Sequence, residues 1–271
     1  MVTTLHGLAL LLYLLTAGGL ARSLVGGGRG GTREGGALLA AAVLVHGAAL
    51  TAYTVEFGEL PLVGLAPALS VLGFLIGALL LAATLVREAR PLGLVLVPLV
   101  AAMLVIGLAL GVQPAGEPLA FRGLWFSLHV VLGFIGCAGL ALAFAAGLLY
   151  LVQFRELKGK RFGRMFRFLP SLEALDRLGH HALVSGFPAF TLALLLGWAW
   201  TVRFQHSFVV QEADVIWGVF TWLSFVVMLL ARRTGVACER RGAVASVVGF
   251  LMVVLVYVAL RVSVAEGRLF L

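Results

Sequence analysis

Long apolar stretches separated by short polar segments run along the whole chain, and this pattern limits what it can fold into. Eight stretches approach or exceed the roughly 20 residues that an α-helix needs to cross a bilayer. They cover 3–24, 37–55, 62–86, 92–112, 124–153, 181–202, 213–231 and 243–263. Only 12% of the residues are charged, against about 25% in soluble domains. We therefore predict an all-α fold: a single integral membrane domain over residues 1–271, built as a polytopic bundle of about eight transmembrane helices.

Lysine and arginine concentrate on one side of this predicted bundle. If successive loops alternate between two sides, one side holds Arg22 and every other basic residue except Arg122, Arg203, Arg261 and Arg268. Cytoplasmic loops retain lysine and arginine, so we expect both termini outside and a multi-pass protein of the bacterial cytoplasmic membrane. The net charge of +8 then describes a face in contact with anionic membrane lipid, and we expect no nucleic-acid partner.

The longest predicted loop, 157–180, is expected to lie on the cytoplasmic surface. Its first half is basic and aromatic, which suits the headgroup layer. Its second half places apolar residues behind Ser171 and predicts a short amphipathic helix capped by that serine. His180 and His181 follow, and we interpret them as interfacial polar residues because neighbours on a helix do not face each other. In the membrane helix that precedes this loop, 124–153, Gly133, Gly136 and Gly139 have the spacing that allows two helices to pack closely.

Three histidines stand where an ionisable side chain is unusual. His46 lies near the middle of 37–55, where such groups are costly and usually functional. His129 lies about 8 Å into 124–153, at a rise of 1.5 Å per residue, and His206 lies in the segment between 181–202 and 213–231. None has a second histidine or cysteine at i+3 or i+4, which disfavours a zinc or copper cluster on one helix. Isolated histidines with aromatic neighbours suit axial ligation of haem, and a buried histidine bonded to a carbonyl or hydroxyl is the open alternative.

The segment GWAWTVRFQHSFVVQEADVIWGVFTWL, 197–223, resembles the tryptophan-rich outer loop of the CcsA/CcmC cytochrome c assembly superfamily. The family pattern begins G-x-x-W and ends W-x-x-x-T-W-L, and its residues recur here as Gly197, Trp200, Trp217, Thr221, Trp222 and Leu223. The tryptophans of the family's haem platform fall on Val209 and Gln211. LHVVLGF, 128–134, resembles the segment that presents the family's first outer haem-ligand histidine, which implies that role for His129.

Other stretches resemble the eight-helix branch of this superfamily, HemX and YpjD, and two positions depart from CcsA. The stretch from Leu169 through 181–202 is similar to the cytoplasmic-plus-membrane helix segment of that branch. A membrane histidine of CcsA falls on Leu230, and no histidine follows His206. The resemblance therefore implies haem held by His129 with His206 or His46, or by one histidine and water.

The implied function is haem trafficking or cytochrome c maturation, without enzymatic activity. The resemblance implies haem b near the outer leaflet and a maturation partner outside the membrane. An aromatic roof of Trp200, Trp217 and Trp222 would cover the porphyrin, although interfacial tryptophans are common in any case. Arg122 or Arg203 would pair with the haem propionates. The alternative is a HemX-like regulator or scaffold, with or without haem, whose basic inner loop contacts a cytoplasmic enzyme of tetrapyrrole synthesis.

Overall fold

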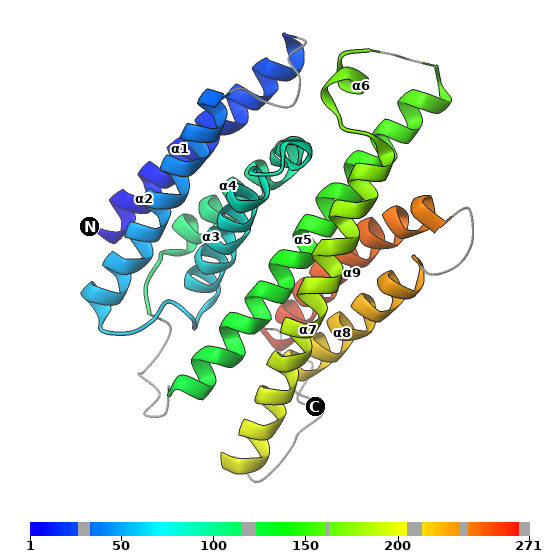
Figure 1. The fold of residues 1–271 in the computed structure, drawn as a ribbon. Coiled ribbons are helices and arrows are strands. Elements are labelled where there is room, and N and C mark those ends of the chain that lie inside the picture. Colours follow the sequence, from blue (N-terminus) through cyan, green and yellow to red (C-terminus); the bar gives the residue numbers. More distant parts are fainter. Residues whose placement is uncertain (27–32, 115–122, 161–162, 205–212, 233–237, 266–271) are drawn as a thin grey trace. The chain divides into compact units, whose positions relative to one another are not determined.

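A computed structural model of the chain describes residues 1–26, 33–114, 123–160, 163–204, 213–232 and 238–265. These residues form helices joined by short turns, and no strand occurs among them (Figure 1). The helices are α1 (Val2–Val25), α2 (Arg33–Phe57), α3 (Leu65–Ala83), the 3-10 helix η1 (Arg87–Leu92), α4 (Gly93–Leu110), α5 (Leu124–Lys158), α6 (Arg164–Phe168), α7 (Leu172–Phe204), α8 (Ala213–Leu230) and α9 (Cys238–Ala265). In the described part, eight helices are long and apolar enough to cross a membrane. The predicted all-α membrane fold is confirmed.

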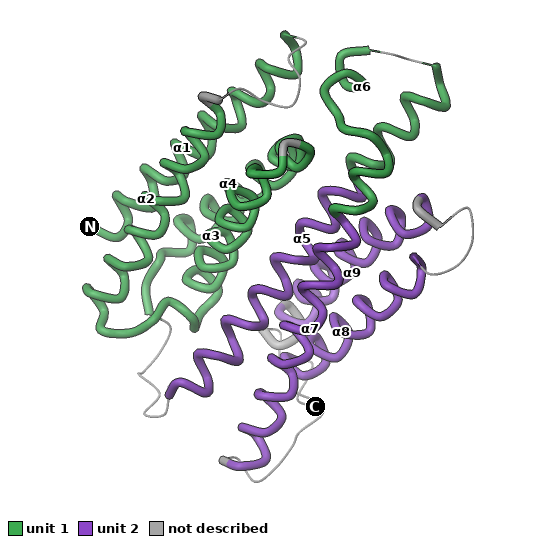
Figure 2. Tube along the Cα trace, viewed as in Figure 1, with its two compact units in different colours: residues 1–120, 149–178 green, residues 121–148, 179–271 purple. Residues whose placement is uncertain are grey.

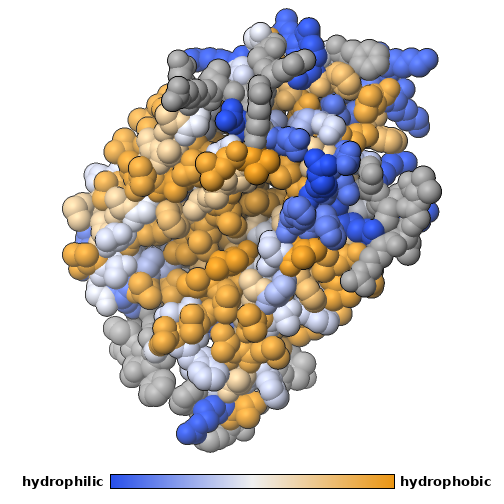
Figure 3. Space-filling model, in the orientation of Figure 1, coloured by the Kyte–Doolittle hydropathy of each residue, from blue (hydrophilic) through white to orange (hydrophobic). Residues whose placement is uncertain are grey.

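The described residues divide into two compact units (Figure 2). Unit 1 comprises 1–120 and 149–178, and unit 2 comprises 121–148 and 179–271. The helices α5 and α7 each contribute one part to either unit. Apolar side chains cover most of the helix surface in view, and hydrophilic ones gather toward the helix ends (Figure 3). Such an exterior suits contact with lipid.

Unit 1 is built from α1 to α4, with α1 against α2 and α4 and with α3 against α2 and α4. Tyr13 of α1 and Ile76 of α3 are fully buried between these helices. The hydroxyl of Tyr13 lies against the backbone of α3, because a Cβ at Gly77 would come within 2.5 Å of that oxygen. The hydroxyl oxygen of Tyr13, a polar atom, is therefore buried in the interior of unit 1.

Unit 2 depends on glycine contacts between α5 and α7. A Cβ at Gly139 would lie 2.9 Å from the Ala182 carbonyl oxygen and 3.1 Å from Gly186 Cα. A Cβ at Gly136 would lie 2.6 Å from Phe190 Cβ. Small residues let membrane helices approach this closely, and the close-packing role predicted for both glycines is confirmed.

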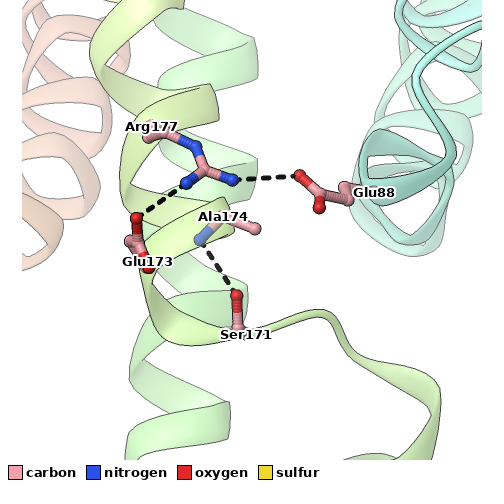
Figure 4. Close-up of polar contacts among 5 residues, drawn as sticks. All are labelled: Glu88, Ser171, Glu173, Ala174 and Arg177. Carbon is pink, nitrogen blue, oxygen red and sulfur yellow. Dashed lines mark hydrogen bonds and ion pairs between the residues drawn. The ribbon is translucent and has the colours of Figure 1, made fainter.

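The structure places the expected surface helix at the start of a membrane helix. Ser171 Oγ accepts a hydrogen bond from the Ala174 backbone N–H at 3.3 Å, so the predicted serine cap is present (Figure 4). The helix then continues without interruption to Phe204, which corrects the separate segments 157–180 and 181–202. Neither Gly179 nor Pro188 ends it. His180 and His181 therefore lie exposed within α7.

Arg177 connects the first turns of α7 to η1 within unit 1. Its guanidinium lies 2.8 Å from Glu173 and 3.3 Å from Glu88 (Figure 4). All three side chains are at least half exposed, and exposed ion pairs stabilise proteins by about 0–1 kcal/mol each. The contact therefore orients the start of α7 more than it stabilises the unit.

Candidate functional site

Two side chains near the start of α5 donate hydrogen bonds to the backbone of α7. Trp125 Nε1 donates to the Leu196 carbonyl at 2.9 Å, and His129 Nδ1 donates to the Ala193 carbonyl at 2.6 Å. Trp125 and His129 stand one helical turn apart and therefore lie on the same face of α5. Both contacts lie within unit 2 and fix the side chains against the last turns of α7.

The bond to Ala193 determines which nitrogen of His129 carries the proton. A carbonyl oxygen only accepts, so Nδ1 must be the donor, and neutral imidazole then keeps its lone pair on Nε2. No hydrogen bond to Nε2 is found among the residues that the structure describes. Metal-ligating histidines typically donate the other ring N–H to a carbonyl or carboxylate in this way, which orients the ring and raises its basicity. The half-buried His129 ring is thus prepared for a ligand at Nε2.

Gly197 allows the imidazole of His129 to occupy this position. A Cβ at residue 197 would lie 2.7 Å from Cε1 and 2.9 Å from Nδ1 of the ring. Any larger residue would push the imidazole away from the Ala193 carbonyl. Gly197 is the glycine of the G-x-x-W pattern, so the structure gives that position a physical role.

Trp217 and Trp222, both on α8, hold the helices of unit 2 together. Trp217 Nε1 donates to the Val253 carbonyl of α9 at 3.1 Å, and its ring contacts Tyr257 at a centroid distance of 5.5 Å. Trp222 Nε1 donates to Thr191 Oγ1 of α7 at 3.1 Å. These contacts give both indoles a packing role between helices. Their predicted role in a roof over a porphyrin stays a prediction, as does that of Trp200, which is half-buried at the end of α7.

Three further site residues predicted from the sequence are Arg122, Arg203 and His206. Arg122 and His206 lie outside the described residues. Arg203 is exposed on the last turn of α7. Nearby in sequence, Asp214 at the start of α8 forms an ion pair with Arg261 of α9 at 3.0 Å. That pair neutralises one carboxylate that would otherwise repel an anionic ligand.

His46 belongs to unit 1, whereas His129 belongs to unit 2. It is fully buried, and both of its ring nitrogens have partners: Nε2 and Ser70 Oγ are 3.0 Å apart, and Nδ1 and Tyr13 OH are 3.4 Å apart. Ligation of iron by His46 would require the loss of one of these bonds, and its role as a haem ligand stays a prediction. The alternative left open by the sequence, a buried histidine bonded to a hydroxyl, describes its observed surroundings.

His6 belongs to the same cluster and is not among the residues predicted from the sequence. It is fully buried, and its Nε2 lies 2.8 Å from Ser70 Oγ. The signal that could have identified it is the one that identified His46, an ionisable residue inside an apolar stretch. Ser70 offers no comparable signal, because serine is common in membrane helices.

The fold and site define a multi-pass helical membrane protein with a preoriented histidine near one end of its second unit. The model of the cytochrome C assembly protein family matches residues 37–265. The chain therefore belongs to the cytochrome c assembly family, and the resemblance predicted from the sequence is confirmed.

The chain is similar to proteins named CcsA and to proteins named HemX. The chain is 28% identical over 150 residues to the cytochrome c biogenesis protein CcsA of Chlamydomonas reinhardtii, covering 55% of this chain and 40% of the relative. It is 28% identical over 103 residues to the protein HemX of Bacillus subtilis, covering 38% and 35%. It is 32% identical over 72 residues to the protein HemX of Brevibacillus brevis, covering 27% and 26%. These matches span less than half of each relative's length.

Proposed function

We propose that the chain binds haem b in the outer part of unit 2, with Nε2 of His129 as an axial ligand to iron. The observation that carries this proposal is the 2.6 Å bond from His129 Nδ1 to the Ala193 carbonyl. In the neutral ring, that bond leaves the lone pair on Nε2, the form that ligates haem iron. Family membership supports the choice of haem as the ligand.

The remaining contacts with haem are proposed from side-chain chemistry. His206 would supply the second axial ligand, with water as its replacement, and Arg122 or Arg203 would pair with the propionates. Trp200 would lie against the porphyrin face. The protein would hold and hand over haem for cytochrome c maturation or haem trafficking, without catalysing a reaction, and a maturation partner outside the membrane would receive it.

We infer the orientation in the membrane from the distribution of the basic residues. The exposed basic side chains in 155–167 lie at the end of unit 1 that we place in the cytoplasm, where positive charge is retained and meets anionic lipid. The first residue of α1 and the start of α5 then face outside. This arrangement places His129 toward the outer leaflet of a bacterial cytoplasmic membrane.

An absorption spectrum of the purified protein after haem supplementation, oxidised and reduced, tests the proposal. We expect a haem spectrum in the wild type that persists in His46→Ala, because the ring of His46 is bonded within unit 1. We expect His206→Ala to change the spectrum of the bound haem to that of a site with a weaker sixth ligand. Loss of haem in His46→Ala with no effect of His206→Ala would contradict this pairing.

A wild type that binds no haem would favour the second candidate, a HemX-like regulator or scaffold. The observation in its favour is a set of exposed cations close together in sequence: Arg155, Lys158, Lys160, Arg164 and Arg167. Such a set could contact an acidic surface of a cytoplasmic enzyme of tetrapyrrole synthesis.

A further inference from the structure

An ion pair joins α8 to α9 at the end of unit 2 that carries His129. Arg261 Nη2 of α9 lies 3.0 Å from Asp214 Oδ1 of α8. At this end of the unit α5 and α8 begin and α7 and α9 end (Figure 1). Between Arg241 and Arg261, α9 contains no charged residue. We propose that Arg261 binds one propionate of haem, an inference that rests on the haem site proposed above.

Residue counting along α5 and α9 places Arg261 close to the level of His129. A Cβ at Gly147 of α5 would lie 2.8 Å from the Ala243 carbonyl oxygen of α9, so the two backbones are in contact there. His129 and Arg261 each lie eighteen residues from that contact, toward the same end of the unit. At the same rise per residue in both helices, the two side chains start from the same level.

A second count runs through α7 and α8 and gives a similar level. Trp222 of α8 bonds to Thr191 of α7. Asp214 lies eight residues from Trp222, whereas Ala193, the partner of His129, lies two residues from Thr191 toward the same end. At 1.5 Å per residue, Asp214 then lies about 9 Å beyond the level of Ala193. Both counts therefore place the ion pair within about 10 Å of the level of His129 along the helix axes.

Aromatic rings place the guanidinium beside a tryptophan of the family pattern. Arg261 Cζ lies 5.3 Å from the centroid of the Tyr257 ring. The Tyr257 ring contacts Trp217 edge to face at a centroid distance of 5.5 Å, and Trp217 contacts Phe190 of α7 at 6.2 Å. A porphyrin covered by Trp217 would therefore have Arg261 next to it.

The ion pair leaves Arg261 able to bind a second carboxylate. The side chains of Arg261 and Asp214 are 51% and 75% exposed, and exposed pairs are weak because water screens them. Arginine carries five N–H donors in a planar fork, whereas a carboxylate offers two oxygens. The guanidinium can therefore hold Asp214 and a propionate together, or exchange one for the other, through charge-assisted bonds. Haem has two propionates, so Arg122 or Arg203 stays available for the other one.

Porphyrin titrations of the full-length protein in phosphatidylcholine nanodiscs test this role. The ligands are haem, metal-free protoporphyrin IX and protoporphyrin IX dimethyl ester, whose esterified carboxylates carry no charge. We expect Arg261→Gln to weaken the binding of haem and of protoporphyrin IX by up to about tenfold. Binding of the ester should stay unchanged, which also shows that the variant is folded.

Two further variants complete the design. Arg241→Gln is the matched control, because it makes the same change at the opposite end of α9, and we expect it to bind all three ligands as the wild type does. His129→Ala should weaken the binding of haem alone, because the other two ligands contain no iron.

Two results would overturn the inference. Wild-type affinities in Arg261→Gln, or an equal loss for all three ligands, would show that the ion pair only joins α8 to α9. Loss of haem in His129→Ala beside an unaffected Arg261→Gln would reject the role of Arg261 and leave the proposed function intact. A selective loss in Arg261→Gln beside wild-type haem binding in His129→Ala would support Arg261 and reject the axial ligand. A wild type that binds none of the three porphyrins would overturn both.

Discussion

We expect Gly197→Ala to weaken the proposed haem binding by about 10–100-fold, the range found when a group that orients a metal ligand is disturbed. The added methyl would lie 2.7 Å from Cε1 of His129. The nearest atoms belong to a side chain that can rotate, so the imidazole moves and the helices stay in place. Movement of the ring breaks the 2.6 Å bond to the Ala193 carbonyl and removes the preorientation of Nε2.

Haem titration of purified Gly197→Ala, followed by absorption, measures this effect. The control is Gly133→Ala, one turn beyond His129 on α5, where a Cβ would meet only Ala193 Cβ at an ordinary 3.8 Å. We expect the control to bind haem as the wild type does. Equal affinities for both variants would contradict the role assigned to Gly197.

Gly139→Ala destabilises unit 2, because the atoms that meet its methyl belong to the backbone of α7. The Ala182 carbonyl oxygen would lie 2.9 Å from the new carbon and Gly186 Cα would lie 3.1 Å from it. Neither atom can rotate away, so α5 and α7 must separate along their contact. Overpacking costs about 1–3 kcal/mol, and the better helix propensity of alanine offsets up to about 1 kcal/mol of it.

Thermal unfolding in detergent, followed by tryptophan fluorescence, measures the stability of both variants. Gly133→Ala is again the control, because it makes the same change on the same helix without a backbone contact. We expect a lower Tm for Gly139→Ala and an equal or higher Tm for Gly133→Ala. Equal Tm values for the two variants would show that α5 and α7 do not touch at Gly139.

The membrane spans could be predicted from the sequence because their signal is local. A bilayer requires about 20 apolar residues in a row, and each span supplies them within itself. The small residues Gly136 and Gly139 carry a similar local signal. The uninterrupted course of α7 could not be predicted. The sequence changes from polar to apolar at residue 181, which resembles the boundary between two helices, but the structure continues one helix through it.

The candidate site was only partly predictable, because its contacts join distant residues. The motif around His129 indicated the residue, but its partner Ala193 is 64 positions away and contributes a backbone carbonyl, which any residue type has. His6 and His46 meet through Ser70, which is 64 and 24 residues from them. Trp217 and Trp222 show a different limit, since tryptophan suits a membrane interface, a helix contact and a porphyrin face alike.

Rescue of a His129→Gly variant by free imidazole tests the central claim most directly. The substitution leaves a space beside the Ala193 carbonyl, and an added imidazole can enter it and ligate the iron in place of the lost ring. We expect haem binding to be lost in the variant and restored by imidazole, while His181→Gly, which removes an exposed histidine of α7, binds haem unaided. A His129→Gly protein with the wild-type haem spectrum in the absence of imidazole would contradict the assignment of His129 as a haem ligand.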